Sequence, residues 1–155
     1  MLALPAPTGG EAAAVNVFAS TITEPEIVEV SRDLFASGHY SLAVQEAYKA
    51  VDKYVGEKVG HKKLSGSKLM DDVFGPNNPK LIWSERKNTS QQDEQSGYHR
   101  LFSGAMLGIR NPVTHEFNWV EEPGLALELL VFAQHLLHKA KIAQLSGMDL
   151  EISKI

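Results

Sequence analysis

The sequence predicts an all-α protein: a bundle of four main helices with one short additional helix and a long polar loop. Two observations lead to this fold class. Over long stretches the apolar residues recur every three or four positions, which is the period of a helix that buries one face. No stretch alternates apolar and polar residues for long, as a half-buried strand would. At 155 residues the chain is long enough for one domain with its own hydrophobic core.

The helical domain is predicted to span residues 23–147. Residues 1–22 are rich in Ala, Pro, Gly and Thr without any period, so we expect a flexible arm or linker. Residues 23–26, Thr-Glu-Pro-Glu, have the form of a capping box and predict the start of the first helix. Apolar residues follow at helical spacing, and Gly38 marks the end of this helix.

The most regular helical pattern runs from about Tyr40 to Val59, where apolar residues recur every three or four positions. A shorter apolar patch at residues 69–74 predicts the short additional helix. Residues 75–92 are mostly polar and are predicted to form a long loop, which in a compact domain is often functional or mobile. Trp83 lies near the middle of this loop, either as its anchor or as a platform for a stacked base.

Two more helices complete the predicted bundle. Asp93 to Asn111 again shows an apolar stripe of helical period, and Pro123 opens a final helix that runs to about Leu145. This final helix is apolar over much of its circumference. It should therefore be buried on more than one side, by its own bundle or by a second subunit. Residues 148–155 are expected to form a C-terminal tail.

Composition excludes several classes of protein and site. The chain has no cysteine, so it has no disulfide and no thiolate nucleophile or metal ligand, which fits the cytoplasmic location that we expect. No apolar run approaches the roughly 20 residues of a membrane span. No signal peptide is expected either, because the first residues lack a basic segment and contain two prolines. Glycine-rich phosphate loops and Ser/His/Asp signatures are absent.

Charge is distributed unevenly along the chain. The net charge is −4, yet residues 49–87 contain nine Lys or Arg against five acids, so this segment carries +4 and the remainder −8. A basic face on an acidic protein can guide a phosphate-bearing ligand. A solvated surface explains the same charges, and both interpretations stay open at this point.

Histidines on the last predicted helix are the best placed for a metal. His135 and His138 are three residues apart, but no third ligand follows at a matching spacing. We therefore expect no metal site and no cofactor.

The stretch GIRNPVTHEF, residues 108–117, holds the strongest candidate site. On a continuous helix, Arg110 and His115 would point about 140° apart and would not converge. Pro112 cannot donate the helical hydrogen bond and disfavours helical geometry in the preceding residue, so we expect the backbone to bend or unwind there. His115 could then fold back toward Arg110.

Other polar groups favour the same region, because His99 and Ser103 lie on Arg110's side of the helix. A simpler interpretation remains. Arg110 and Asn111 would then cap a helix end, and His115 would pack in the loop that follows.

A penultimate helix that ends in R-N-x-x-x-H, followed by one more apolar helix, resembles the HEPN superfamily, most closely its Ymh-like, abortive-infection branch. The resemblance covers roughly residues 24–145. It includes the segments LFASGHYSLAVQEAYKAV, KLMDDVF, QSGYHRLFSGAMLGIRNPVTHE and ALELLVFAQHLL. The diagnostic pattern is an arginine, an adjacent polar residue and a histidine, here Arg110, Asn111 and His115.

The resemblance implies a metal-independent ribonuclease site built from two such motifs across a homodimer, often in toxins or anti-phage effectors. Some members carry a tyrosine two residues after the histidine, which a partner nucleotidyltransferase modifies. Phe117 stands at that position and has no hydroxyl, so this mode of control is not expected here.

The function expected from the sequence is therefore RNA cleavage by the substrate's own 2′-OH. His115 would transfer the proton, Arg110 would hold the phosphate, and Asn111 would orient the pair. Further RNA contacts are expected from the basic segment and from the arginine's side of the helix: Lys62, Lys63, Arg86, Lys87, His99 and Ser103. Expected partners are RNA, a second copy of the chain and an antitoxin or larger defence system. The alternative is a HEPN module that binds nucleotide or RNA, or mediates assembly, without catalysis.

Overall fold

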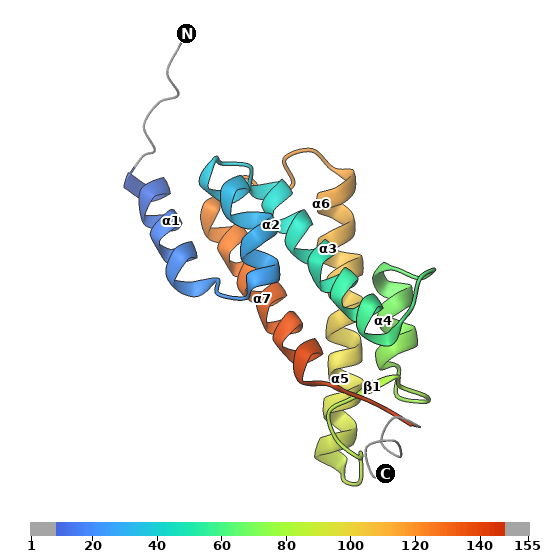
Figure 1. Cartoon of the computed structure of the whole chain (residues 1–155). Helices are drawn as coiled ribbons and strands as arrows, with labels where there is room; N and C mark the ends of the chain where they lie inside the picture. The colour runs from blue at the N-terminus through green and yellow to red at the C-terminus, as the bar shows by residue number, and fades with distance from the viewer. Residues whose placement is uncertain (1–8, 148–155) are drawn as a thin grey trace.

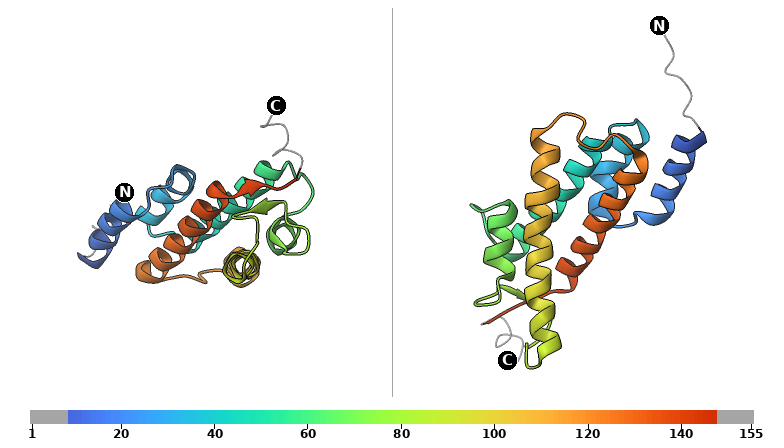
Figure 2. Two further views of the ribbon diagram at one scale, coloured as in Figure 1. Left: turned by 90° about the horizontal axis from the view of Figure 1, so that it is seen from below. Right: turned by 180° about the vertical axis from the view of Figure 1, so that it is seen from behind.

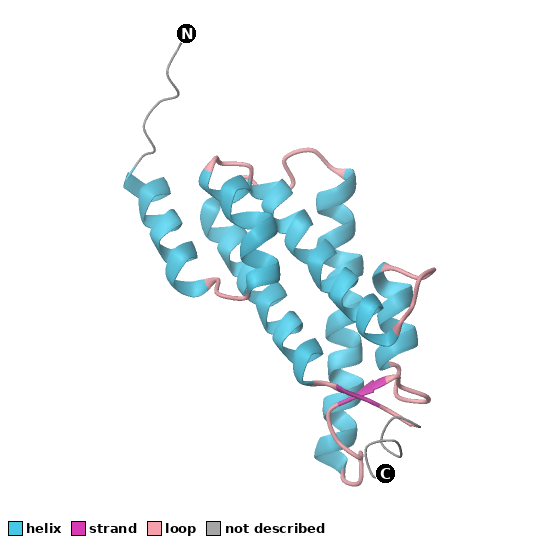
Figure 3. Cartoon of the chain, viewed as in Figure 1, coloured by secondary structure: helices cyan, strands magenta, loops and turns pink. Residues whose placement is uncertain are grey.

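The structure, a computed structural model, describes residues 9–147 (Figure 1), so the predicted C-terminal tail lies outside the described residues. The fold is all-α, as predicted (Figure 3). In chain order the elements are α1 (Gly9–Thr21), α2 (Pro25–Ala36), α3 (Tyr40–Val59), α4 (Gly66–Phe74), β1 (Leu81–Ile82), α5 (Thr89–Ala105), the π-helix η1 (Met106–Arg110), α6 (Asn111–His115), α7 (Pro123–Ile142) and β2 (Gln144–Leu145).

Helix α3 lies at the centre of the bundle. It packs against α2 on one side and α7 on another, while α4 packs against α5. Helices α5, η1 and α6 follow one another as a single long rod, seen nearly end-on in the left view of Figure 2. Tyr48 of α3 is fully buried and donates its hydroxyl to the Leu129 carbonyl of α7 at 2.8 Å. This bond ties the two central helices together inside the core.

Helix α1 differs from the flexible arm that the sequence predicts for residues 1–22; the first eight of these lie outside the described part. Residues 9–21 form a helix, and Phe18 stacks on Phe35 of α2 at a ring-centroid distance of 5.0 Å. The sequence of this helix shows no clear apolar stripe because the segment is rich in alanine. Alanine has the highest helix propensity but gives little apolar contrast between faces.

The start of α2 is also held differently from the predicted capping box. Its N-cap is Glu24, and no side-chain hydrogen bond caps the helix from within. Instead, the Gln134 amide oxygen of α7 accepts from the Thr23 and Glu24 N–H groups at 2.7 and 3.1 Å. Its amide nitrogen donates to the Thr21 carbonyl at 2.9 Å. One side chain of α7 thus fixes the whole α1–α2 turn.

The broad apolar surface of α7 is largely covered within one chain. Helices α1, α2 and α3 all pack on it, so a second subunit is not needed to explain its composition. The helix ends three residues earlier than predicted, and residues 144–145 pair antiparallel with residues 81–82 in a two-stranded sheet. Among residues 9–147, no helix combines the length and apolarity that crossing a membrane demands.

Trp83 anchors the polar loop, which is shorter than predicted because α5 begins at Thr89. Its ring stacks on Phe74 at 5.2 Å with an interplanar angle of 8°. Its indole N–H donates to the Lys139 carbonyl at 2.8 Å. With its face on a core ring and its N–H bonded, Trp83 is a structural residue rather than a platform for a base.

Lys58 closes the C-terminal end of α7. Its Nζ donates to the carbonyls of Ala140, Lys141 and Ala143 at 2.8, 2.9 and 2.6 Å. Burial lowers its pKa from the usual value. Helix ends leave carbonyls without partners, and one ammonium satisfies three of them here.

We expect Lys58→Met to lower the free energy of unfolding by about 1–3 kcal/mol, because it leaves these carbonyls unpaired while keeping most of the aliphatic packing. Lys53→Met is the matched control, since Lys53 is exposed and its nearest contact with Glu57 is 3.9 Å. The control should change the free energy by less than about 0.5 kcal/mol. Urea denaturation measures both, and equal losses would contradict the assignment.

Candidate functional site

The helix that carries Arg110 does not break at Pro112, contrary to the sequence prediction. Arg110 and Asn111 have right-handed helical angles, with φ of −62° and −65°, and α6 continues to residue 115. The π-turn η1 lies directly before the proline, and the Asn111 N–H bonds to the Met106 carbonyl five residues back. A proline in a regular α-helix clashes with the carbonyl four residues back. The wider turn gives a physical reason why the helix passes through this position.

His115 therefore does not fold back toward Arg110 within one chain. Arg110 is half-buried and faces α3 and α4, whereas His115 is exposed at the end of α6. The simpler interpretation of the motif is wrong as well. Arg110 and Asn111 lie inside a continuous helix rather than at its end, and His115 is not packed in a loop.

Arg110 occupies a niche formed by α3 and the start of α4. Its Nη1 lies 3.4 Å from the position that a Cβ atom on Gly66 would take. Gly66 has a φ of +65°, and its N–H donates to the Asp52 carboxylate of α3 at 2.6 Å. Burial raises the pKa of Asp52, while the Gly66 N–H and the Arg110 charge both act to lower it. The guanidinium thus rests on a glycine beside a half-buried carboxylate.

Within this niche Arg110 is incompletely satisfied. Its Nη1 donates to Asn111 Oδ1 at 3.4 Å, a long hydrogen bond. Its Nε is buried and has no hydrogen-bond partner among the described residues. A buried donor without a partner costs about 1–3 kcal/mol. Arg110 is therefore not held here by a complete set of hydrogen bonds.

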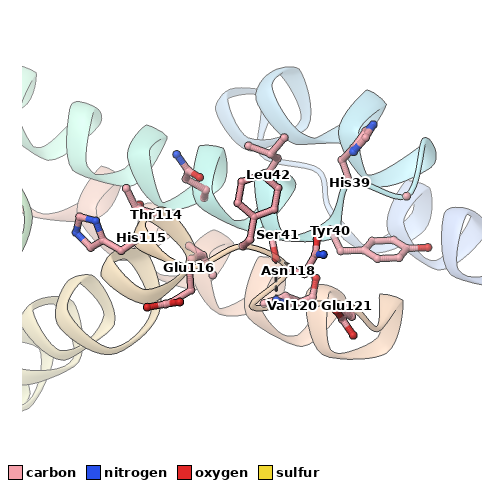
Figure 4. A pocket seen from close by; sticks show the side chains of 14 residues that line it. His39, Tyr40, Ser41, Leu42, Thr114, His115, Glu116, Asn118, Val120 and Glu121 are labelled. Atoms are coloured by element: carbon pink, nitrogen blue, oxygen red, sulfur yellow. Dashed lines mark hydrogen bonds between the residues drawn. The ribbon is translucent and has the colours of Figure 1, made fainter.

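His115 lies on the border of a pocket of about 430 Å³. The pocket is formed by the first turn of α3, the end of α6 and the loop that follows it (Figure 4). Ser41 holds this loop in place, because its hydroxyl donates to the Val120 carbonyl at 3.0 Å and accepts from the Val120 N–H at 2.7 Å. His39 lies at the other end of the pocket from His115 (Figure 4).

Large apolar side chains are exposed in the loop after His115 and on the rod that leads to it. Phe117, two residues after His115, is 98% exposed, and Trp119 is 55% exposed. On the rod, Leu107 is 62% exposed and Leu101 is 44% exposed. Large apolar side chains that are exposed in this way can take part in a protein–protein contact.

His99 and Ser103 do lie on the side of the rod that faces α4, as Arg110 does. His99 Nε2 is 2.8 Å from Asp71 Oδ1, and Ser103 hydrogen-bonds the same carboxylate. Burial acts to raise the pKa of Asp71, but the hydrogen bonds from His99 and Ser103 outweigh it and hold that pKa below its usual value. Both residues are therefore engaged with an acid rather than presented to an anion.

The basic segment divides into paired and unpaired side chains. Lys87 pairs with Glu85 at 2.5 Å, and Arg86 donates to the Pro76 carbonyl at 2.9 Å within its own loop. Lys62 and Lys63 are exposed in the turn before α4, and across residues 9–147 neither forms an ion pair with an acid. This turn leads directly to Gly66, on which Arg110 rests.

The other histidine pair makes a protein contact. His135 Nε2 is 2.5 Å from the Tyr98 hydroxyl, and His138 is exposed on the same helix. In the part of the chain that the structure describes, no three His, Cys, Asp or Glu side chains are grouped so that they could hold a metal ion.

Asp52 and Gly66 are the site residues that the sequence did not indicate. They are 58 and 44 positions before Arg110, and only the packing of α3 and α4 against the rod brings them near it. The one available signal was Gly66 itself. A glycine just before an apolar patch can mark a backbone turn with positive φ, but it does not indicate which side chain rests on it.

Comparison with known proteins gives one match. The model of a family described as "Protein of unknown function (Hypoth_ymh)" matches residues 22–140. The match includes Arg110, Asn111 and His115 and begins directly after α1. No curated protein and no solved structure matches the chain. Because the family model covers well over half of its length, the chain belongs to the Hypoth_ymh family.

Proposed function

We propose that this protein is a metal-independent RNA endonuclease of the HEPN type, with an active site completed by a second copy of the chain. His115 transfers the proton of the attacking 2′-OH or of the leaving oxygen. Arg110 stabilises the charge that develops on the phosphate, and Asn111 orients the arginine. Cells would use such an activity as a toxin or an anti-phage effector, restrained by an antitoxin or a larger defence complex.

The observation that carries this proposal is the exposed apolar face around His115. One chain turns Arg110 inward and His115 outward, so a single copy does not bring the two together. Phe117, two residues after His115, and Leu107, three residues before Arg110, are both exposed. A partner that covers these residues would bring its own histidine and arginine to the same cleft, and exclusion of water there strengthens every electrostatic contact.

Two lysines extend the proposed RNA contact. Lys62 and Lys63 stand in the turn that leads to Gly66, next to the arginine niche, and have no acidic partners among the described side chains. Phosphates that flank the scissile one meet free ammonium groups there. Arg86 and Lys87 take a smaller part, because both have partners in their own loop.

The experiment that tests the proposal is cleavage of RNA by the purified chain in excess EDTA. We expect cleavage under these conditions and products that end in a 2′,3′-cyclic phosphate or its hydrolysis product. Cleavage that EDTA abolishes and Mg²⁺ or Mn²⁺ restores would overturn it. The exposed Lys62 and Lys63, in the turn that leads to Gly66, favour a second candidate, a module that binds RNA without cutting it. Binding without cleavage in this assay would select that alternative.

We expect the protein to be a homodimer, with the exposed face of the α5–η1 rod in the contact and α7 adding little. Leu107→Glu places a charge in that contact and should yield monomers at micromolar concentration without activity, although Arg110 and His115 are intact. Val17→Glu is the control, since Val17 of α1 is 47% exposed and far along the chain from the rod. Light scattering measures the mass, and a monomeric wild-type chain would contradict the prediction.

A further inference from the structure

We infer that Asp52 is a positioning residue for Arg110: both groups lie against Gly66, and the charge of the carboxylate helps to keep the guanidinium in this niche without a direct ion pair. The consequence for RNA cleavage rests on the proposed function, whereas the coupling between the two side chains does not. Neither Asp52 nor Gly66 belongs to the R-N-x-x-x-H pattern.

The first reason is that packing alone does not account for Asp52. It lies in the middle of α3 and is half-buried. Burial of a carboxylate is unfavourable unless hydrogen bonds or opposite charge compensate for it. The compensation consists of the Gly66 N–H at 2.6 Å and the positive charge of Arg110. The Arg110 charge therefore favours the charged form of Asp52, although burial outweighs it and leaves the pKa of this carboxyl above its usual value.

The second reason is the shape of the niche. A Cβ on Gly66 would stand 3.4 Å from Arg110 Nη1, in ordinary van der Waals contact, so the guanidinium lies directly against this glycine. Gly60, only six residues earlier, also has positive φ, yet nothing lies within 4 Å of a Cβ built on it. Both glycines meet a backbone requirement, but of the two only Gly66 also lies against the arginine.

The consequence concerns which nitrogens face a phosphate. The buried Nε has no partner, so an arginine fork that uses Nε is closed to a ligand in this orientation. A phosphate is then met by the terminal nitrogens only. Without the charge of Asp52, the guanidinium is free to leave the niche and to meet the phosphate in other geometries. Asp52 thus affects turnover more than binding, because misplacement of a charged donor by about 1 Å costs up to about 10²-fold in rate.

The experiment compares Asp52→Asn with wild type and with Asp72→Asn. The asparagine keeps an oxygen for the Gly66 N–H and loses only the charge, so the thermal melt should change little. Asp72 of α4 pairs with Lys80 and His61 instead, so its variant removes a charge that is not coupled to Arg110. The readout is the Arg110 Nε–H resonance in ¹⁵N NMR, which Arg110→Lys identifies by its loss.

In wild type and Asp72→Asn we expect this resonance to be protected from exchange with water, and in Asp52→Asn we expect the protection to be lost. An unchanged resonance in Asp52→Asn overturns the inference, whether or not the chain cleaves RNA. Gly66→Ala should shift the same resonance and Gly60→Ala should not, although both carry the strain of alanine at positive φ. Equal effects of the two would also overturn it.

RNA cleavage supplies the functional half of the test. In Asp52→Asn we expect kcat to fall by up to about 10²-fold with KM nearly unchanged. A wild-type chain without activity would refute the proposed ribonuclease function. The NMR result would then decide by itself whether Asp52 positions Arg110. An active wild type with an equally active Asp52→Asn would refute the positioning role.

Discussion

His115→Ala should lower the rate of RNA cleavage by about 10²- to 10⁴-fold and leave RNA binding nearly unchanged. The substitution removes the proton-transfer group, whose contribution has this magnitude, but keeps the arginine and the lysines that bind phosphate. His39→Ala is the matched control, because His39 lines the same pocket and is exposed like His115. The control should retain nearly full activity. Equal losses for the two histidines would show that the pocket, rather than a specific acid or base, supports the reaction.

Arg110→Ala should lower both the rate of RNA cleavage and the affinity for RNA. It removes a charge-stabilising donor worth on the order of 10²- to 10³-fold in rate, and it also weakens RNA binding. Arg110→Lys should restore binding better than turnover, because an ammonium supplies the charge without the planar fork. Binding to an RNA that cannot be cleaved and single-turnover rates separate the two effects. If Arg110→Ala binds and cleaves as wild type does, this arginine has no part in the site.

The long helices could be predicted from the sequence because a helix that buries one face has apolar residues every three or four positions. Helix α3 begins and ends where the pattern of apolar residues predicts, at Tyr40 and Val59. Helix α1 left no such trace, since alanine occupies both its buried and its exposed positions. An anchoring role was one of the two roles predicted for Trp83, and the structure confirms it. Its partners, Phe74 and Lys139, could be identified only from the fold.

The geometry of the candidate site could not be predicted from local sequence patterns. Proline disfavours the interior of a regular α-helix, so a break at Pro112 was expected. The structure has a π-turn before the proline instead, and the helix continues. No spacing in the sequence indicates that choice. The motif residues Arg110, Asn111 and His115 could be identified from the sequence, but it did not show that Arg110 is half-buried while His115 is exposed. Asp52 was out of reach altogether, because it approaches Arg110 only through tertiary packing.

Because Arg110 and His115 are separated within one chain, the identity of the nucleophile is the most decisive question about the proposed reaction. The proposed site contains one proton-transfer group, His115, and one phosphate-binding group, Arg110. RNA offers its own nucleophile, the 2′-OH next to the scissile phosphate. With that hydroxyl in place, His115 and Arg110 suffice, since attack within the substrate needs only acid–base help and charge stabilisation.

Replacing the ribose on the 5′ side of the scissile phosphate with 2′-deoxyribose should therefore block cleavage at that bond completely, with binding retained. Neighbouring bonds in the same RNA should still be cut, which makes each substrate its own control. A 2′-O-methyl group at the same place should block cleavage equally, because it removes the proton that His115 takes up. Gel analysis of end-labelled substrates measures both. If the deoxy bond is cut at the normal rate, water is the nucleophile, and the roles assigned to His115 and to the ribose fail together.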